Sequence, residues 1–323
     1  MRAIVIEKCC KAEELHVCEI PVPEVRPGWV LIKVHAAGLN HSEALLRMYE
    51  ADNEYINTPV VPGIECVGEV ADPSDSHLTK GDKVIALMGG MGRSFNGSYA
   101  EYALLPEKNV FRINSNLDWV SLAAVPETYY TAYGSLFECL RLTKDDTLLV
   151  RGATSTVGQA AIQLAKAIGS QVIATGRRKS SFAMLQSIGA DYCLIDDGVL
   201  SSAPYGQELP RPNKILELVG PKTLRDSLLT VSRPGYVCNT GILGNVFTVE
   251  HFDPIKYIPN GVFLTGFYSN YPTQPNIDGL FNLINRSGIQ PLYNRVFTLD
   301  EITQAHSLLE AGGAGGKIIL QIW

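Results

Sequence analysis

The sequence predicts an α/β protein in which a doubly wound parallel Rossmann sheet is joined to a second, mostly β domain. Beyond about residue 120, apolar strands alternate with helices, which is typical of a parallel sheet covered on both faces. Residues 1–110 instead hold short apolar strands separated by Pro and Gly, a pattern that favours a partly open β-barrel. Residues 146–178 run strand, tight turn, helix and strand, one βαβ unit.

Composition narrows the class of protein. The chain of 323 residues has 46% hydrophobic and 19% charged residues, as expected for a soluble globular enzyme. Its formal net charge of −6 argues against a nucleic-acid partner, and no apolar run approaches the ~20 residues of a membrane helix. Seven cysteines, an odd number without a Cys-x-x-Cys pair, favour reduced thiols. We therefore expect a cytoplasmic protein with no membrane partner.

The predicted elements of the β domain follow in chain order. Strands are expected over residues 3–6, 15–19, 29–37, 66–71, 83–86 and 97–105. One helix is expected over residues 42–48, with Ser42 as its N-cap.

The second half supplies the alternating elements. Helices are expected over 120–125, 131–138, 159–168, 182–188, 222–230, 277–286 and 300–309. Strands are expected over 146–151, 171–175, 192–195, 215–218, 236–240, 262–267 and 317–322, with a loop over 198–213. The last strand is expected to return to the first domain. This predicts a first domain of residues 1–121 and 263–323, a second domain of residues 122–262, and a site in the cleft between them.

The turn after the strand at 146–151 is built from small residues. Ala153, Ser155 and Gly158 stand where the dinucleotide fingerprint Gly-x-Gly-x-x-Gly has its glycines. Small residues let a pyrophosphate approach the backbone N–H groups at the start of the following helix. The turn therefore predicts a dinucleotide site; the alternative is a plain βαβ crossover that needs small residues only for packing.

The end of the strand at 171–175 indicates which dinucleotide. NAD sites place a carboxylate there for the ribose 2′-hydroxyl, whereas NADP sites place cations for the 2′-phosphate. This chain has Gly176, Arg177, Arg178 and Lys179 and no carboxylate. Because Arg can bind a phosphate through two parallel N–H bonds, we predict NADPH. The alternative is a solvated charge run at a strand end.

Six further motifs carry a resemblance to a known family. They are AAGLNHSE (36–43), PGIECVGEV (62–70), GDKV (81–84), GSYAEY (97–102), LQSIGAD (185–191) and GKIIL (316–320). In this order, they resemble the medium-chain dehydrogenase/reductase superfamily along nearly the whole chain, and within it the zinc-free quinone oxidoreductase group. The resemblance implies a GroES-like, partly open barrel as the catalytic domain, a Rossmann NADP(H)-binding domain, and a homodimer.

Two departures from the zinc enzymes of this superfamily bear on the chemistry. Those enzymes carry a zinc-binding Cys and His where this chain has Asn40 and Ile64, and residues 88–93 lack the cysteines of their structural zinc site. Since a catalytic zinc needs three protein ligands, we predict no metal. The alternative is a zinc held by Cys66 and His41. Without a metal, hydride transfer favours acceptors that spread the incoming charge. We predict a quinone or an α,β-unsaturated carbonyl as the substrate.

The resemblance also assigns site residues. It implies cofactor contacts from Asn40, Thr131, Ala153, Ser155, Thr156, Val157, Gly176, Arg177, Arg178, Lys179, Thr240, Gly241, Ile242, Gly266, Phe267 and Lys317. Catalytic candidates are Asn40, Tyr49 and Tyr55, and further proton-donor candidates are Tyr133, His41 and solvent.

Several alternatives stay open. The tyrosines could serve packing only, His41 could make a structural hydrogen bond, the residues after 239 could form only a strand-end turn, and Lys317 could be a surface cation. The chain could also reduce another carbonyl or an enoyl thioester, or bind NADPH as a sensor without turnover.

Overall fold

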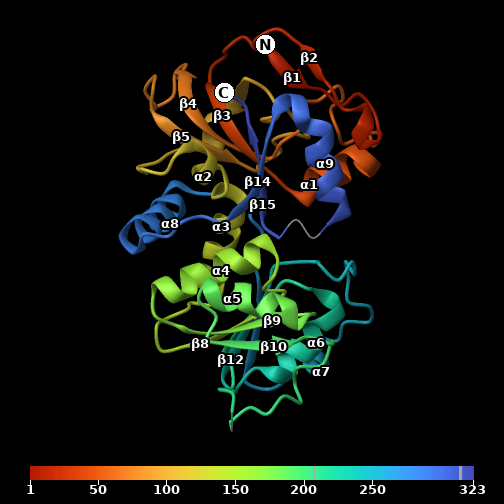
Figure 1. Ribbon diagram of the computed structural model, residues 1–323, viewed down its shortest axis with the longest axis vertical. Helices are drawn as coiled ribbons and strands as arrows, with labels where there is room; N and C mark the ends of the chain where they lie inside the picture. Colours follow the sequence, from red (N-terminus) through yellow and green to blue (C-terminus); the bar gives the residue numbers. More distant parts are fainter. Residues whose placement is uncertain (207, 313–314) are drawn as a thin grey trace. The chain divides into compact units, whose positions relative to one another are not determined.

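The structure is a computed structural model that describes residues 1–206, 208–312 and 315–323 (Figure 1). It divides into two compact units. Unit 1 comprises Met1–Tyr130, Ser269–Asn285 and Gln290–Trp323, and unit 2 comprises Thr131–Tyr268 and Arg286–Ile289. The domain limits expected from the sequence stay a prediction.

Unit 2 is built on a six-stranded parallel sheet with the order β10-β9-β8-β11-β12-β13. This is the Rossmann order 3-2-1-4-5-6, so the predicted fold class is confirmed. Its strands are β8 (Thr147–Arg151), β9 (Gln171–Gly176), β10 (Tyr192–Ile195), β11 (Lys214–Glu217), β12 (Gly235–Asn239) and β13 (Val262–Gly266). β11 is buried along its whole length because helices cover a parallel sheet on both faces.

The helices of unit 2 connect these strands. They are α4 (Thr156–Ala167), α5 (Phe182–Ser187), α6 (Pro221–Thr230) and α7 (Pro254–Tyr257), with the short segments η4 (Gly134–Cys139) and η5 (Lys179–Ser181). α4 packs on β8 and β9, and α6 packs on β11 and β12. The core between them includes Leu149, Ile173 and Val237, all fully buried.

The start of α4 corrects the sequence prediction. Helix was expected from Gln159, but it begins at Thr156 because Ser155 is the N-cap. The Ser155 hydroxyl accepts a hydrogen bond from the N–H of Gly158 at 3.1 Å, which satisfies one open donor of the first turn. Three residues expected in the turn therefore belong to the helix.

Unit 1 contains a seven-stranded sheet and a two-stranded one. The larger has the order β14-β15-β3-β4-β5-β7, with β6 also paired to β3. The strands of unit 1 are β1 (Arg2–Ile4), β2 (Val17–Glu19), β3 (Trp29–Leu39), β4 (Glu65–Asp72), β5 (Lys83–Leu87), β6 (Tyr102–Pro106), β7 (Val110–Arg112), β14 (Tyr293–Thr298) and β15 (Lys317–Gln321). β15 pairs antiparallel with β3, which confirms that the last strand returns to the first sheet. Among the described strands, the two ends of this order, β14 and β7, do not pair with each other, so the sheet does not close into a barrel.

The helices of unit 1 are short. They are α1 (His41–Leu45), α2 (Trp119–Ala123) and α9 (Ile302–Ala311), with the segments η1 (Ala12–Glu14), η2 (Leu46–Glu50), η3 (Glu107–Asn109) and η6 (Leu299–Glu301). α3 (Pro126–Tyr133) and α8 (Gln274–Ser287) each continue past a limit of unit 1. Strands β7 and β14 were not expected from the sequence.

The N-cap predicted for α1 was wrong. Asn40, rather than Ser42, stands at the cap position. The Glu43 carboxylate accepts from the Asn40 N–H at 2.8 Å, as in the reciprocal half of a capping box. Both residues are acceptable caps by type, so the position of Glu43 three residues later decides between them.

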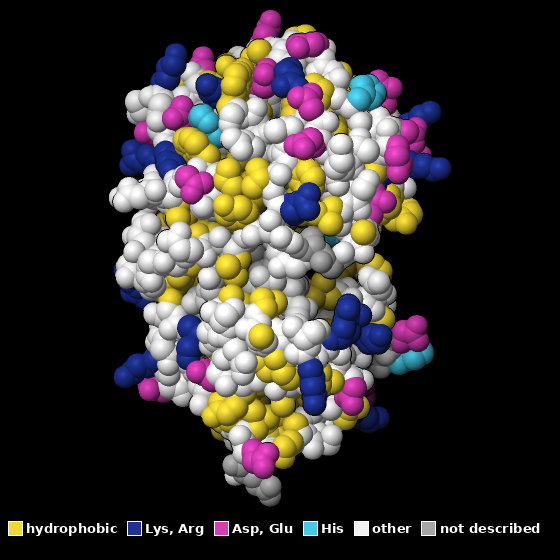
Figure 2. Space-filling view, viewed as in Figure 1, with side chains coloured by type: hydrophobic (Ala, Val, Ile, Leu, Met, Phe, Trp, Pro, Cys, Tyr) yellow, Lys and Arg dark blue, Asp and Glu magenta, His cyan; other side chains and the backbone are white. Residues whose placement is uncertain are grey.

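Two findings bear on charged partners and on membranes. On the face that Figure 2 shows, acidic and basic side chains are interspersed rather than gathered by sign. Among the described residues, no helix combines the length and apolarity needed to cross a bilayer.

Candidate functional site

The turn between β8 and α4 presents open N–H groups in unit 2. Gly152 has φ +85°, a left-handed conformation that favours glycine, and its N–H donates to the Thr175 hydroxyl at 3.2 Å. The N–H groups of Thr156 and Val157 lie in the first turn of α4, where a helix offers them no carbonyl. An anion at this position would receive both donors and the positive end of the helix dipole.

Gly158 keeps the turn tight against the strand. A Cβ at this position would lie 2.7 Å from the Ala153 Cα and 2.7 Å from the Gly152 carbonyl oxygen, so no side chain fits. This is the role of the third fingerprint glycine, which lets the helix pack closely on the strand. The residues present therefore fit a bound pyrophosphate although the first two fingerprint positions are Ala and Ser.

The three cations that follow β9 form what we call the basic run. They lie next to the turn between β8 and α4, which we call the phosphate turn. Arg177, Arg178 and Lys179 are all exposed, and none forms an ion pair with a described residue. The backbone turns tightly here because the Ser181 hydroxyl donates to the Arg178 carbonyl at 2.7 Å. A Cβ on Gly176 would lie 2.6 Å from that Ser181 hydroxyl, so a side chain there would displace this hydroxyl. Such cations can meet a phosphate without first breaking a protein ion pair.

Three of the predicted cofactor residues of unit 2 are joined through η4. The Ser135 hydroxyl donates to the Thr131 carbonyl at 2.7 Å and lies 2.8 Å from the Thr240 hydroxyl. The ring of Phe267 lies against Gly134, where a Cβ would stand 2.0 Å from a ring carbon. Thr131, Thr240 and Phe267, far apart in sequence, are thus held by one segment. Gly241 and Ile242 continue from Thr240, and Ile242 is exposed.

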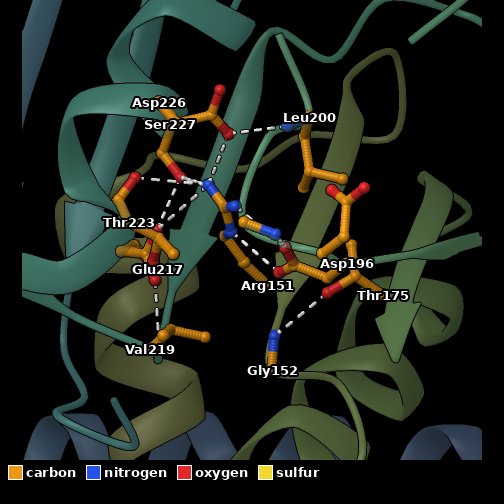
Figure 3. A network of polar contacts seen from close by, with 12 residues as sticks. Arg151, Gly152, Thr175, Asp196, Leu200, Glu217, Val219, Thr223, Asp226 and Ser227 are labelled. Carbon is orange, nitrogen blue, oxygen red and sulfur yellow. Dashed lines mark hydrogen bonds and ion pairs between the residues drawn. The ribbon is translucent and has the colours of Figure 1, made fainter. Parts of the chain in front are cut away.

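A charge cluster that sequence reasoning missed stands just before the phosphate turn (Figure 3). Arg151 is fully buried and binds Asp196 through two nitrogens at 2.8 and 2.9 Å. Its remaining terminal nitrogen lies 2.8 Å from Asp226 and 3.0 Å from the Ser227 hydroxyl. Glu217 is 3.9 Å away. The cluster ties the carboxyl end of β8 to the ends of β10 and β11 and to α6.

In unit 1, Asn40 lies in a buried polar network. Its amide oxygen accepts from the Lys317 ammonium at 2.6 Å, and its amide nitrogen donates to Glu65 at 2.8 Å. Lys317 also binds the same Glu65 carboxylate at 2.5 Å. These contacts fix the orientation of the Asn40 amide, since its oxygen must face the cation and its nitrogen the carboxylate.

Neighbouring groups fix this network in place. The second oxygen of Glu65 accepts from the N–H of Glu127 at 2.7 Å. A Cβ on Gly38 would lie 2.4 Å from Lys317 and 2.6 Å from Glu65, so the network fills the space above this glycine. The alternative that Lys317 is a surface cation is wrong, because the residue is 2% exposed.

Glu43 lies beside the network and behaves differently. Its carboxyl is fully buried and accepts from the N–H groups of Ile64 at 3.0 Å and Asn40 at 2.8 Å. Burial raises the pKa of Glu43 above its usual range, although these N–H groups and Lys317 oppose the rise. Ile64, at the position of the zinc-binding His, is itself buried.

The tyrosine candidates lie on the surface of unit 1. Tyr49 and Tyr55 are 68% and 63% exposed, and the Asn53 amide donates to the Tyr55 hydroxyl at 3.3 Å. Tyr49 borders a cavity of about 610 Å³ that is also lined by Cys10 and Arg47 but not by Asn40. Tyr133, in unit 2, packs against Phe137.

Two arginines of unit 1 are held in ion pairs. Arg47 binds Glu310, and Arg93 binds Glu50 at 2.7 Å. His41, the neighbour of Asn40, is exposed. Among the described residues, no group of three His, Cys, Asp or Glu side chains is arranged to hold a metal ion.

Comparison with known proteins agrees with both units. The family profile described as the alcohol dehydrogenase GroES-like domain matches residues 26–115, and the profile described as zinc-binding dehydrogenase matches residues 156–285. The quinone oxidoreductase of Rattus norvegicus is 27% identical over 313 residues, covering 94% of this chain and 92% of its own. The chain belongs to the medium-chain dehydrogenase/reductase superfamily, in its quinone oxidoreductase-like group.

Solved structures of similar proteins share the fold. The quinone oxidoreductase from Coxiella burnetii is 26% identical, with a TM-score of 0.83 and coverage of 100% of this chain and 99% of its own. The AibC structure has a TM-score of 0.89 at 24% identity and covers 100% of this chain and 96% of its own, which supports the fold alone. Membership of this superfamily makes the protein an oxidoreductase that uses a nicotinamide dinucleotide.

Proposed function

We propose that this protein transfers a hydride from NADPH to a quinone or an α,β-unsaturated carbonyl without zinc. The observation that supports this proposal is the hydrogen bonding of the Asn40 side chain. Asn40 stands where zinc enzymes of the superfamily have a Cys ligand. Its amide is held between Lys317 and Glu65 at 2.6 and 2.8 Å. Ile64, at the second ligand position, has no donor atom in its side chain.

Bound NADPH would supply the hydride, and the chain would supply its binding and orientation. The open N–H groups of Thr156 and Val157 would receive the pyrophosphate. Thr131, Thr240 and Phe267, held together through η4, would border the nicotinamide. The Asn40 oxygen has two lone pairs, and the Lys317 ammonium donates to one of them. The other could accept a hydrogen bond from the amide of the nicotinamide.

The substrate class follows from the lack of a Lewis acid in this proposal. A simple ketone would become an alkoxide, which needs strong charge stabilisation. A quinone or an enone spreads the new charge over a conjugated system, and a few hydrogen-bond donors are then enough. Tyr49 and Tyr55 remain proposed donors, as does solvent.

A parallel assay tests the reaction. The purified protein would be mixed with NADPH and, separately, with 9,10-phenanthrenequinone, a simple enone and an aldehyde. We expect oxidation of NADPH with the first two acceptors, unchanged by a chelator such as EDTA. Turnover with the aldehyde only, lost on chelation, would contradict the proposal. Binding of NADPH without turnover on any acceptor would favour a sensor.

The basic run supports NADPH over NADH and can be tested by substitution. Replacing Arg177 and Arg178 by Ala removes two exposed cations that have no ion-pair partner among the described residues. We expect NADPH binding to weaken by about 1.5–3 kcal/mol, the range for one hydrogen bond to a charged group, while NADH binding hardly changes. Isothermal titration with both nucleotides measures the difference. The control is Lys222→Ala, which removes a different cation of unit 2. Equal losses of affinity for both nucleotides would contradict the assignment of the basic run to the 2′-phosphate.

A further inference from the structure

Two thiols lie beside predicted cofactor residues of unit 2. Cys139 is the last residue of η4, and Cys238 lies within β12. Cys238 is fully buried, whereas Cys139 is half-buried. Cys238 pairs with Thr265 across β12 and β13, next to the Gly266 carbonyl that the Cys139 thiol reaches. The two thiol side chains therefore lie within reach of each other, although the residues are far apart in sequence.

Both sulfurs also contact residues assigned to the cofactor. The Cys139 thiol lies 3.4 Å from the carbonyl oxygen of Gly266. The Cys238 sulfur lies 3.4 Å from the Thr240 hydroxyl, which is 2.8 Å from Ser135. A change at the thiol pair would therefore reach the ends of β12 and β13.

The two thiols differ in reactivity. The hydrogen bond from Cys238 lowers the pKa of Cys139 to about 7, although burial opposes this effect. The same bond, together with burial, raises the pKa of Cys238. Because the thiolate is the nucleophile, Cys139 is the thiol that reacts first, and Cys238 is placed to react second.

We propose that Cys139 and Cys238 form a reversible disulfide on exposure to a hydroperoxide, and that this bond weakens binding of the nicotinamide nucleotide. The second half of the proposal rests on the proposed function, because it needs the nucleotide to bind beside Thr240 and Gly266. The site described above uses neither sulfur.

The chemistry requires only the peroxide as a co-reactant. The Cys139 thiolate attacks one peroxide oxygen, the O–O bond breaks, and hydroxide leaves with a sulfenic acid on Cys139. The Cys238 thiol loses its proton, its sulfur attacks the Cys139 sulfur, and the S–O bond breaks as hydroxide leaves. With hydrogen peroxide, two thiols are oxidised by two electrons and the peroxide becomes two water molecules.

The disulfide changes the contacts of the cofactor residues. The Cys139 thiol can no longer donate to Gly266, and the end of η4 must move toward β12 as the sulfurs close to bonding distance. We expect NADPH to bind about three- to tenfold more weakly, the change that corresponds to one net hydrogen bond.

The first experiment tests the bond. The full-length reduced protein is titrated with hydrogen peroxide and measured as an intact mass, and a second portion is alkylated and measured as peptides. We expect a loss of roughly 2 Da, a peptide that joins Cys139 to Cys238, and full reversal by dithiothreitol. Cys139→Ser and Cys238→Ser should each prevent the linked peptide. If oxygen adducts accumulate instead, or if no linked peptide forms, the proposal is overturned.

A matched control lies in the same unit. Cys193, in β10, is also half-buried, but its sulfur faces the Phe182 carbonyl at 3.9 Å rather than a second thiol. Cys193→Ser should leave disulfide formation unchanged. If Cys238→Ser does not fold because the site is fully buried, the half-buried Cys139→Ser still decides the question.

The second experiment tests the consequence. NADPH affinity is measured by nucleotide fluorescence for the reduced and the fully oxidised protein, with Cys139→Ser treated in the same way. We expect weaker binding only in the oxidised wild type, restored by dithiothreitol. Equal affinity in a fully disulfide-bonded sample would overturn the regulatory half. Absence of quinone turnover, with the disulfide and its effect on NADPH intact, would overturn the proposed function alone.

Discussion

Two buried cations, Arg151 of unit 2 and Lys317 of unit 1, are surrounded differently. Arg151 of unit 2 meets three carboxylates, from Asp196, Asp226 and Glu217, within 3.9 Å. Lys317 of unit 1 meets one carboxylate, from Glu65, and the amide of Asn40. The guanidinium is used to join elements, whereas the ammonium orients a single side chain.

The geometry of the two side chains explains the difference. A guanidinium offers five donors in a planar fork, and Arg151 uses this fork to bind groups from β10 and α6 at once. An ammonium is a compact point charge with three donors. Two donors of Lys317 go to Glu65 and Asn40, and no other partner of this ammonium occurs among the described residues. Arg151 donates to side chains from several elements, which is suited to stability. Lys317 keeps one donor without a partner among the described residues, which is suited to a site.

The largest expected effect is the loss of stability on removing Arg151. Arg151→Met leaves buried carboxylates without their cation, which costs about 3–5 kcal/mol for a buried pair. Urea unfolding followed by circular dichroism measures the change. The control is Lys166→Met, which breaks a partly exposed pair with Asp191 at 2.9 Å and should cost about 0–1 kcal/mol. Similar losses in both variants would show that the Arg151 cluster does not hold unit 2 together.

A smaller loss is expected for the other cation. Lys317→Met should cost less than Arg151→Met, at the lower end of the ~3–5 kcal/mol for a broken buried pair, because only one carboxylate loses its charge partner and Glu65 keeps the N–H of Glu127. Turnover of a quinone should also fall at least about tenfold, since Asn40 would lose the contact that orients its oxygen. Steady-state kinetics and urea unfolding separate the two effects.

The double variant Lys317→Met with Glu65→Gln sharpens this test. Removing both charges should restore part of the stability but not the activity, because the buried charge is gone while Asn40 stays unoriented. Lys83→Met is the control, since the Lys83 ammonium donates to the carbonyls of Ser115 and Leu117 at 3.1 and 2.8 Å and lies over the Trp119 ring. It forms no ion pair with a carboxylate among the described residues. Activity that recovers together with stability would contradict a positioning role for Lys317.

The sequence predicted local structure better than it predicted these clusters. The βαβ unit could be found because its periodicity and its stop at Gly169, with φ +87°, are encoded within a few neighbouring residues. Strand β10 was predicted with the bounds that the structure has. Strand β14 was missed because five of its six residues are exposed, so its sequence does not resemble a buried strand.

Contacts between distant residues could not be predicted. Glu65 and Lys317 are 252 positions apart, and only the pairing of β15 with β3 brings Lys317 next to Asn40. Arg151 was expected only as the last residue of a buried strand. Its partners are set by the strand order, which composition and periodicity do not fix. A charged residue at the end of a buried strand is the one signal that pointed to this cluster.

The smallest expected effect is a difference in how the clusters respond to acid. Burial acts to raise the pKa of Asp226, but the N–H groups of Leu200 and Ser201, the Ser201 side chain and Arg151 together bring it below the usual 3.8. Its contribution to stability is therefore present above pH 3.8 and is lost as the pH falls through the lower folded value. Glu43 has a raised pKa, so its contribution is present below 4.5 and is lost as the pH rises through the folded value.

Carboxyl carbon NMR titration of the two residues measures these opposite signs directly. We expect Asp226 to keep its charge below the pH at which a free Asp protonates, and Glu43 to take up its proton above the pH of a free Glu. Asp226→Asn and Glu43→Gln assign the resonances. In urea unfolding, the stability lost in Asp226→Asn should shrink as the pH falls below 3.8, because the wild type then loses the same charge. A loss that stays constant down to the lowest pH would show that Arg151 does not depend on the charge of Asp226, and the contrast between the two clusters would then lie in packing alone.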